Sequence, residues 1–203
     1  VRLLVEPDNG IYDAMNKGLS MATGDYICFL NAGDSLHNND TIGSLVRNTC
    51  VDSYITEDGG KDRMPAVLYG NTDIVDDNGN FICHRRLSPP EHLTWMSFRD
   101  GMLVCHQAFY ARTDIAKKTA FNTVYRFSAD FDWCIRIMKE AESRRLPLID
   151  SHIILVNYLK EGTTTKNHKA SLKERFRIMA TYYGLTTTYL RHAWFVMRAI
   201  IKR

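Results

Sequence analysis

The sequence has no long apolar segment and none of the closely spaced cysteine pairs that hold zinc. Its apolar runs all fall short of the roughly 18 residues of a membrane-spanning helix, so we expect none. Five cysteines are spread singly, and an odd number without a CxxC spacing argues against a disulfide framework or a zinc cluster. The first residues lack the features of a signal peptide. These absences favour a reducing, cytoplasmic setting.

Proline and glycine are also few, with 5 and 12 in 203 residues, and there is no internal repeat. With 45% hydrophobic and 24% charged residues, the composition excludes a disordered chain and suits one globular domain. Charge is uneven, because residues 160–203 hold ten Lys and Arg against two acids, whereas residues 1–159 carry a net charge of −5. A basic end predicts an anionic partner, phospholipid or nucleic acid; the alternative is two solvated helix faces.

The order of apolar patterns predicts an α/β fold. Short apolar runs indicate strands at residues 1–5, 26–30, 66–69, 102–111 and 153–156. Helical spacing of apolar residues runs from Ile11 through Met15 and Leu19, and again after Ser128, a candidate cap. Two further helical segments follow the polar residues 162–165, and a face of the second holds Leu190, Ala193, Trp194, Met197 and Ile201. We expect a mixed, mostly parallel sheet flanked by helices, with a C-terminal helical appendix.

Two acidic residues, Asp34 and Asp130, lie at positions where functional side chains are expected. Ligands of open α/β sheets bind beyond the carboxyl ends of strands, and Asp34 follows the run 26–30 by four residues. A carboxylate there suits Mg²⁺ or Mn²⁺ together with substrate phosphates; the alternative is an acid that shapes a turn. Asp130 lies in the first turn of the helix behind Ser128, where the helix dipole lowers the pKa of a carboxyl group. Taken alone, it fits a dipole-complementing acid better than a catalytic one.

Other polar residues are less specific by themselves. A histidine within an apolar run, such as His106, is more often a satisfied core residue than a catalytic one. Asn16 and Lys17 share the polar side of the first helix with Asp13, as a solvated face would. Asp132 follows Asp130 by two residues and therefore points elsewhere on the helix.

Five blocks of the sequence together are similar to those of a known family: residues 6–18, 22–26, 29–34, 105–107 and 128–132. On these blocks, the chain as a whole resembles family-2 glycosyltransferases of the GT-A fold, in particular the bacterial colanic-acid and capsular polysaccharide branch. It extends over about residues 3–165, so we expect a glycosyltransferase domain at 1–165 and a basic helical extension at 166–203.

The resemblance implies an enzyme that moves a sugar from a nucleotide-sugar to a saccharide acceptor with inversion at the anomeric carbon. The acceptor is expected to be linked to a polyprenyl lipid in cell-surface polysaccharide synthesis, at the inner face of the plasma membrane. A second hypothesis is a non-catalytic relative that acts as a partner of a polysaccharide-synthesis enzyme. Nucleic acid is not an expected partner, because no motif for it accompanies the basic end.

The resemblance also assigns roles to residues. Asp130 matches the family's catalytic base. Residues 31–34 lie at the metal-binding DxD element, where Asp34 alone keeps a carboxylate, so the diphosphate is expected to supply more of the Mg²⁺ or Mn²⁺ shell. The implied nucleotide-sugar contacts are Asp8, Asn16, Lys17 and Asn31, and the implied acceptor or sugar pocket holds His106, Gln107 and Asp132.

Members of the family normally begin with two further strands, which hold the base and ribose of the nucleotide. Nothing that resembles them precedes Glu6. The resemblance therefore implies a domain that is incomplete at its N-terminus. We expect these 203 residues alone to bind a nucleotide-sugar poorly, and robust turnover by them would contradict this.

The segment 190–201 would be about 18 Å long as a helix, too short to span a bilayer. Its Trp194 and Phe195 lie beside Arg191 and Arg198, a composition that suits the plane of an anionic membrane. The alternative is a helix that packs back on its own domain.

Overall fold

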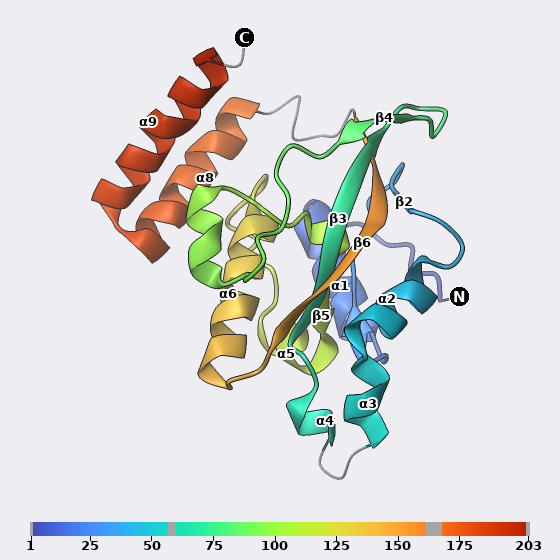
Figure 1. Ribbon diagram of the computed structural model, residues 1–203. Helices are drawn as coiled ribbons and strands as arrows, with labels where there is room; N and C mark the ends of the chain where they lie inside the picture. Colours follow the sequence, from blue (N-terminus) through green and yellow to red (C-terminus); the bar gives the residue numbers. More distant parts are fainter. Residues whose placement is uncertain (1, 57–59, 161–167, 202–203) are drawn as a thin grey trace.

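The computed structural model describes residues 2–56, 60–160 and 168–201 (Figure 1). Its helices are α1 (Ile11–Met21), α2 (Thr41–Thr49), α3 (Val51–Thr56), α4 (Gly60–Arg63), α5 (Thr113–Lys118), α6 (Ala129–Ser143), α8 (His168–Tyr183) and α9 (Leu185–Ile201), with 3₁₀ turns η1 (Trp95–Asp100) and η2 (His106–Ala108). Its strands are β1 (Tyr26–Ile27), β2 (Ser35–Leu36), β3 (Val67–Val75), β4 (Phe81–His84), β5 (Phe109–Arg112) and β6 (Leu148–Leu159).

The strands form one mixed sheet in the order β1-β5-β3-β6-β2, with β4 paired to the far end of β3. Helices flank both faces (Figure 1), so the expected mixed α/β architecture is confirmed. The strands are not mostly parallel, however. Among the described strands only β3 and β6 run parallel, and the other pairings are antiparallel. The sequence could not show this, because an apolar run identifies a buried strand but not the direction of its neighbours.

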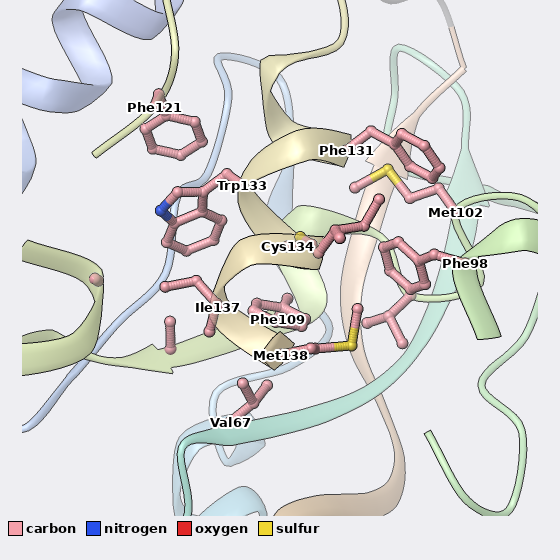
Figure 2. Packing of buried hydrophobic residues seen from close by; sticks show 14 of the residues in the cluster. Val67, Phe98, Met102, Phe109, Phe121, Phe131, Trp133, Cys134, Ile137 and Met138 are labelled. Carbon is pink, nitrogen blue, oxygen red and sulfur yellow. The ribbon is translucent and has the colours of Figure 1, made fainter. Parts of the chain in front are cut away.

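The larger core cluster lies where α6 packs on the sheet (Figure 2). Trp133 of α6 is fully buried and stacks on Phe121 with ring centroids 4.7 Å apart. Phe109 of β5 meets the same indole edge-on. Tyr12, Met15 and Leu19 bring α1 into this cluster. Tight aromatic packing around α6 therefore fixes the position of its N-terminal turn, which carries Asp130.

Several local expectations were wrong. Residues 2–8 form no strand, and only Phe109–Arg112 of the run 102–111 pairs in the sheet, since residues 106–108 turn as η2. The hydroxyl group of Ser128 does not cap α6; its Oγ lies 3.0 Å from that of Ser171 in α8. Ile11 is exposed, and Tyr12 takes its place in the buried stripe of α1. The polar residues 162–165 lie outside the described residues.

Gly70 allows β3 and β6 to pair through an irregularity. The register jumps from Tyr69↔Asp150 to Asn71↔Ile154, so β6 carries extra residues at this point. A Cβ atom on Gly70 would lie only 2.6 Å from the carbonyl oxygen of Ile153 and 2.7 Å from Ser151 Oγ. The bulge and the glycine therefore require each other.

We expect Gly70→Ala to lower the free energy of unfolding by about 1–3 kcal/mol, because a backbone carbonyl in the central pairing must move. Gly18→Ala is the matched control. A Cβ atom on Gly18 in α1 meets nothing within 4 Å, so alanine should stabilise the helix by roughly 0.5–1 kcal/mol. Urea denaturation of both variants measures the difference, and equal effects would contradict the close contact.

Candidate active site

Asp34 lies in the loop between β1 and β2 and is tied to two distant segments. Its Oδ1 accepts a hydrogen bond from the backbone N–H of Leu159 at the end of β6, at 3.0 Å. Its Oδ2 accepts one from the side-chain amide of Gln107 in η2, at 2.7 Å. The carboxylate therefore sits where the loop, β6 and η2 meet, and it is half-buried.

Asp130 lies in the first turn of α6, and both of its oxygens are engaged. Oδ1 accepts from the Tyr12 hydroxyl group at 3.0 Å and from the backbone N–H of Phe131 at 2.9 Å. Oδ2 lies 3.1 Å from Nδ1 of His106, and the side chains of Asp130 and His106 are only 12% and 10% exposed. Asp130 is thus a buried carboxylate held by three segments.

His106 connects this carboxylate to the Asp34 loop. Its Nε2 lies 3.5 Å from the side-chain amide nitrogen of Asn31, while Nδ1 faces Asp130. One tautomer fits both contacts: Nδ1–H donates to Asp130, and the lone pair of Nε2 faces the Asn31 amide. Gln107, the next residue of η2, contacts Asp34. One short turn therefore brings together five of the residues singled out in the sequence.

The electrostatics keep Asp130 ionised. Burial alone would raise the pKa of its carboxyl group, but the hydrogen bond and charge of His106, the charge of Arg175 in α8 and the Phe131 N–H lower it to about 2. Burial and the nearby Asp130 carboxylate raise the pKa of Tyr12, so its hydroxyl group keeps its proton and donates. A carboxylate with so low a pKa is a weak base and a good partner for an imidazolium ion.

The lowered pKa of Asp130 predicts an acid-sensitive contribution to stability. Ionised Asp130 stabilises the fold fully above its unfolded pKa near 4, and this stabilisation is lost as the pH falls through about 2. The contribution is on the order of 2 kcal/mol. We therefore expect Asp130→Asn to flatten the fall in unfolding free energy across this range. Urea denaturation at a series of pH values tests this, and an unchanged acid dependence would contradict it.

Three expected nucleotide-sugar residues lie apart from this group and hold the N-terminal region together. Asp8 Oδ1 accepts from the N–H of Gly10 at 2.8 Å, and Lys17 donates to the Pro7 carbonyl oxygen at 2.6 Å. Asp8 and Lys17 also line a surface hollow of about 400 Å³ beside α1. The side-chain amide of Asn16 pairs with the backbone of Phe121.

Asp132 is also engaged elsewhere. It accepts from Arg136 Nε at 2.7 Å and from the Tyr182 hydroxyl group of α8 at 2.8 Å. The bond from Tyr182 thus links α6 to α8, on a different side of α6 from Asp130.

Sequence reasoning missed Tyr12 and Arg175. Tyr12 belongs to the block that carries the family resemblance, and its position at helical spacing from Met15 and Leu19 could have placed it on the buried face. Arg175 acts on Asp130 from α8, 45 residues further along the chain, and no local pattern signals this contact.

The residues around Asp34 could supply only part of the coordination shell of a divalent cation. The described residues contain no group of three side chains that could cage a metal ion. Asp34 offers one carboxylate, whose oxygens keep acceptor capacity beyond the hydrogen bonds from Leu159 and Gln107. Mg²⁺ often binds through one or two carboxylates plus substrate phosphates, so the donor set suits a cation that arrives with a diphosphate.

Comparison with known proteins gives a family match over the N-terminal part of the chain. Residues 1–63 match the glycosyl transferase family 2 profile. This matched segment holds α1 with Tyr12 and the loop with Asn31 and Asp34, and the described mixed sheet flanked by helices is consistent with a GT-A-like glycosyltransferase domain.

Curated relatives carry glycosyltransferase names. The chain is 32% identical over 164 residues to the "PGL/p-HBAD biosynthesis glycosyltransferase" of Mycobacterium bovis (strain BCG / Pasteur 1173P2), covering 79% of this chain and 56% of the relative. It is 30% identical over 132 residues to the "Amylovoran biosynthesis glycosyltransferase AmsB" of Erwinia amylovora, covering 62% of this chain and 40% of that protein. The chain thus spans about half the length of the curated relatives it matches.

Proposed function

We propose that the protein is an inverting glycosyltransferase that moves a sugar from a nucleotide-sugar to a hydroxyl group of a saccharide acceptor. The observation that carries the proposal is the set of contacts joining Asp130, His106 and Asn31 next to the Gln107–Asp34 pair. It sets a buried acid–imidazole pair beside a carboxylate suited to a diphosphate-bound cation. Sugar transfer needs both, one to take a proton and one to support the leaving group.

In the proposed reaction, the acceptor oxygen forms a bond to the anomeric carbon as the bond from that carbon to the diphosphate breaks. The electron pair leaves with the diphosphate, and the acceptor proton moves to Nε2 of His106. Asp130 holds the imidazole by its Nδ1–H and stabilises the imidazolium that forms. The family resemblance implies Asp130 as the catalytic base. We propose that His106 receives the proton in its place, because both Asp130 oxygens already contact Tyr12, Phe131 and His106, whereas Nε2 faces the Asn31 side chain.

Other residues prepare the site. Asp34 would hold Mg²⁺ or Mn²⁺, which when bound stabilises the negative charge on the departing diphosphate. Gln107 keeps the Asp34 carboxylate in place through its amide. We assign Asn31 to the donor sugar and keep Asp8, Asn16 and Lys17 as nucleotide-side candidates. Asp132 remains a candidate for the acceptor side through the α6–α8 contact.

We further propose that the product belongs to a cell-surface polysaccharide or glycolipid. The names of the relatives support this, since one refers to PGL/p-HBAD biosynthesis and the other to the biosynthesis of amylovoran. An acceptor linked to a polyprenyl lipid, at the inner face of the plasma membrane, would fit either product class, as would membership of the colanic-acid and capsular branch.

The test is release of nucleoside diphosphate by the full-length protein, because the 203 residues alone are expected to bind a nucleotide-sugar poorly. The donors are a panel of UDP-, GDP- and dTDP-linked hexoses, with Mg²⁺ or Mn²⁺ and a bacterial lipid extract as acceptor. We expect one donor to be consumed only when the extract is present, and His106→Ala to slow this consumption by at least about 100-fold. The alternative function, a non-catalytic partner of a polysaccharide-synthesis enzyme, is supported by the single carboxylate at residues 31–34. It would be favoured if no donor reacts while the protein raises transfer by such an enzyme.

A further inference from the structure

Helix α9 presents its apolar side to solvent. Six large hydrophobic residues of this helix are 47–68% exposed: Leu185, Tyr189, Leu190, Trp194, Val196 and Met197. At about 100° per residue they all fall within one half of the helix circumference. Surface helices of globular proteins normally turn such a stripe toward the core, so α9 is rotated the opposite way.

The inward side of α9 carries three polar residues, Thr188, Arg191 and His192, together with Phe195, which packs against the larger core cluster. Thr188 is fully buried, and Arg191 forms an ion pair with Asp100 of η1. His192 packs against Phe176 of α8 with ring centroids 5.1 Å apart. The helix is thus anchored to the domain through these contacts, and its rotation is fixed by them. The alternative that α9 packs on its own domain is therefore confirmed, while its apolar stripe stays uncovered by the described residues. The expected position on an anionic membrane stays a prediction.

A row of cations lies beside this stripe, on the neighbouring helix. Lys169, Lys173 and Arg177 of α8 are exposed and spaced four residues apart, so they form one line along the helix. The stacking of Phe176 on Tyr189 and His192 fixes how α8 and α9 are turned toward each other. Counting about 100° per residue from this contact places the basic row and the apolar stripe on the same side, away from the core.

We propose that this side of the α8–α9 pair docks on an anionic lipid surface. In the docked state the apolar stripe of α9 lies among the acyl chains at the interface, and the three cations of α8 contact the lipid phosphates. The helices lie in the membrane plane; in the part of the chain that the structure describes, none is long and apolar enough to cross a bilayer. The charge of this face favours anionic lipid over a second copy of the chain as its partner. Symmetric pairing of two copies would bring two basic rows together, and these rows would repel each other.

The proposal is independent of the proposed sugar transfer. It rests on the exposed residues of α8 and α9, and its readout is lipid binding without any donor or acceptor. A failure here would leave the assignment of His106 and Asp130 untouched, and a failure of catalysis would leave the docking surface untouched.

The experiment is co-flotation of the 203-residue chain with phosphatidylcholine vesicles that contain or lack phosphatidylglycerol. We expect binding to the anionic vesicles only. The double variant Leu190→Asp/Met197→Asp should bind them about tenfold more weakly or not at all, since it places charge on the stripe. The triple variant Lys169→Gln/Lys173→Gln/Arg177→Gln should lose the preference for anionic lipid. Ile42→Asp on α2, an exposed apolar residue on the other side of the sheet (Figure 1), is the matched control and should bind normally.

Two results would overturn the proposal. One is a folded parent chain, verified by circular dichroism, that does not bind anionic vesicles. The other is binding that the stripe variants leave unchanged although they unfold at the parent's temperature. Light scattering identifies the competing occupant: a dimer that Leu190→Asp/Met197→Asp converts to a monomer, without vesicle binding by the parent, would assign the face to a second copy.

Discussion

The His106→Ala variant is expected to lose about 10²- to 10⁴-fold of its sugar-transfer rate, the range that a positioned general base contributes. The physical reason is that Nε2 faces the side chain of Asn31, the residue assigned to the donor sugar. The Asp130 oxygens, in contrast, are occupied by Tyr12, Phe131 and His106 itself. Added imidazole should restore part of the rate, which would not happen if His106 served only to hold the fold. The measurement is release of nucleoside diphosphate from the donor that the panel identifies.

A second aspartate–histidine pair in the molecule provides the control. His84 Nδ1 lies 2.7 Å from Asp73 on the β3–β4 hairpin, and its side chain is largely exposed. His84→Ala should leave transfer unchanged. If Asp130 were itself the base, Asp130→Asn would abolish transfer and His106→Ala would retain most of it. If the two act as a unit, the double variant should be no slower than the slower single variant.

Removing the charge of Asp34 is expected to have the second-largest effect. Asp34→Asn keeps an oxygen that can accept from Leu159 or Gln107, so the loop should stay in place, but the only acid of residues 31–34 is gone. We expect transfer to fall by about 100-fold or more and the half-saturating Mg²⁺ or Mn²⁺ concentration to rise about tenfold. Titration of either ion in the donor assay measures both changes.

Asp114→Asn is the matched control for this substitution. Asp114 is also a carboxylate with two hydrogen-bonding partners, but they are Arg112 and Arg144 on the α5–α6 side. Its loss should leave the metal dependence unchanged. An Asp34→Asn variant with the parent's metal dependence would show that this carboxylate only ties the loop to β6.

The sequence predicted the placement of both acids well because each depends on a local pattern. An apolar run followed by a turn located Asp34, and a helical stripe behind Ser128 located Asp130, although Ser128 turned out to contact α8 instead of capping α6. Local patterns could not predict which side chains occupy the Asp130 oxygens. Those partners come from α1 and η2, and the charge of Arg175 acts from α8; only the packed chain brings them together.

The rotation of α9 about its axis shows a different limit of prediction from the sequence. Periodicity correctly placed Leu190, Trp194 and Met197 on one face, but it cannot say which way that face points. The direction is set by Arg191 and His192, whose partners Asp100 and Phe176 lie on other helices. A hydrophobic stripe was therefore predictable, and its exposure was not.

His106 and Gln107 are consecutive residues of η2, yet they serve opposite ends of the proposed reaction. Because a single peptide bond joins the two residues, a movement of Asp34 that shifts Gln107 would also shift the backbone of His106 and its imidazole. Binding of the donor and its cation at Asp34 would therefore shift the His106 imidazole, which receives the acceptor's proton, through this one turn.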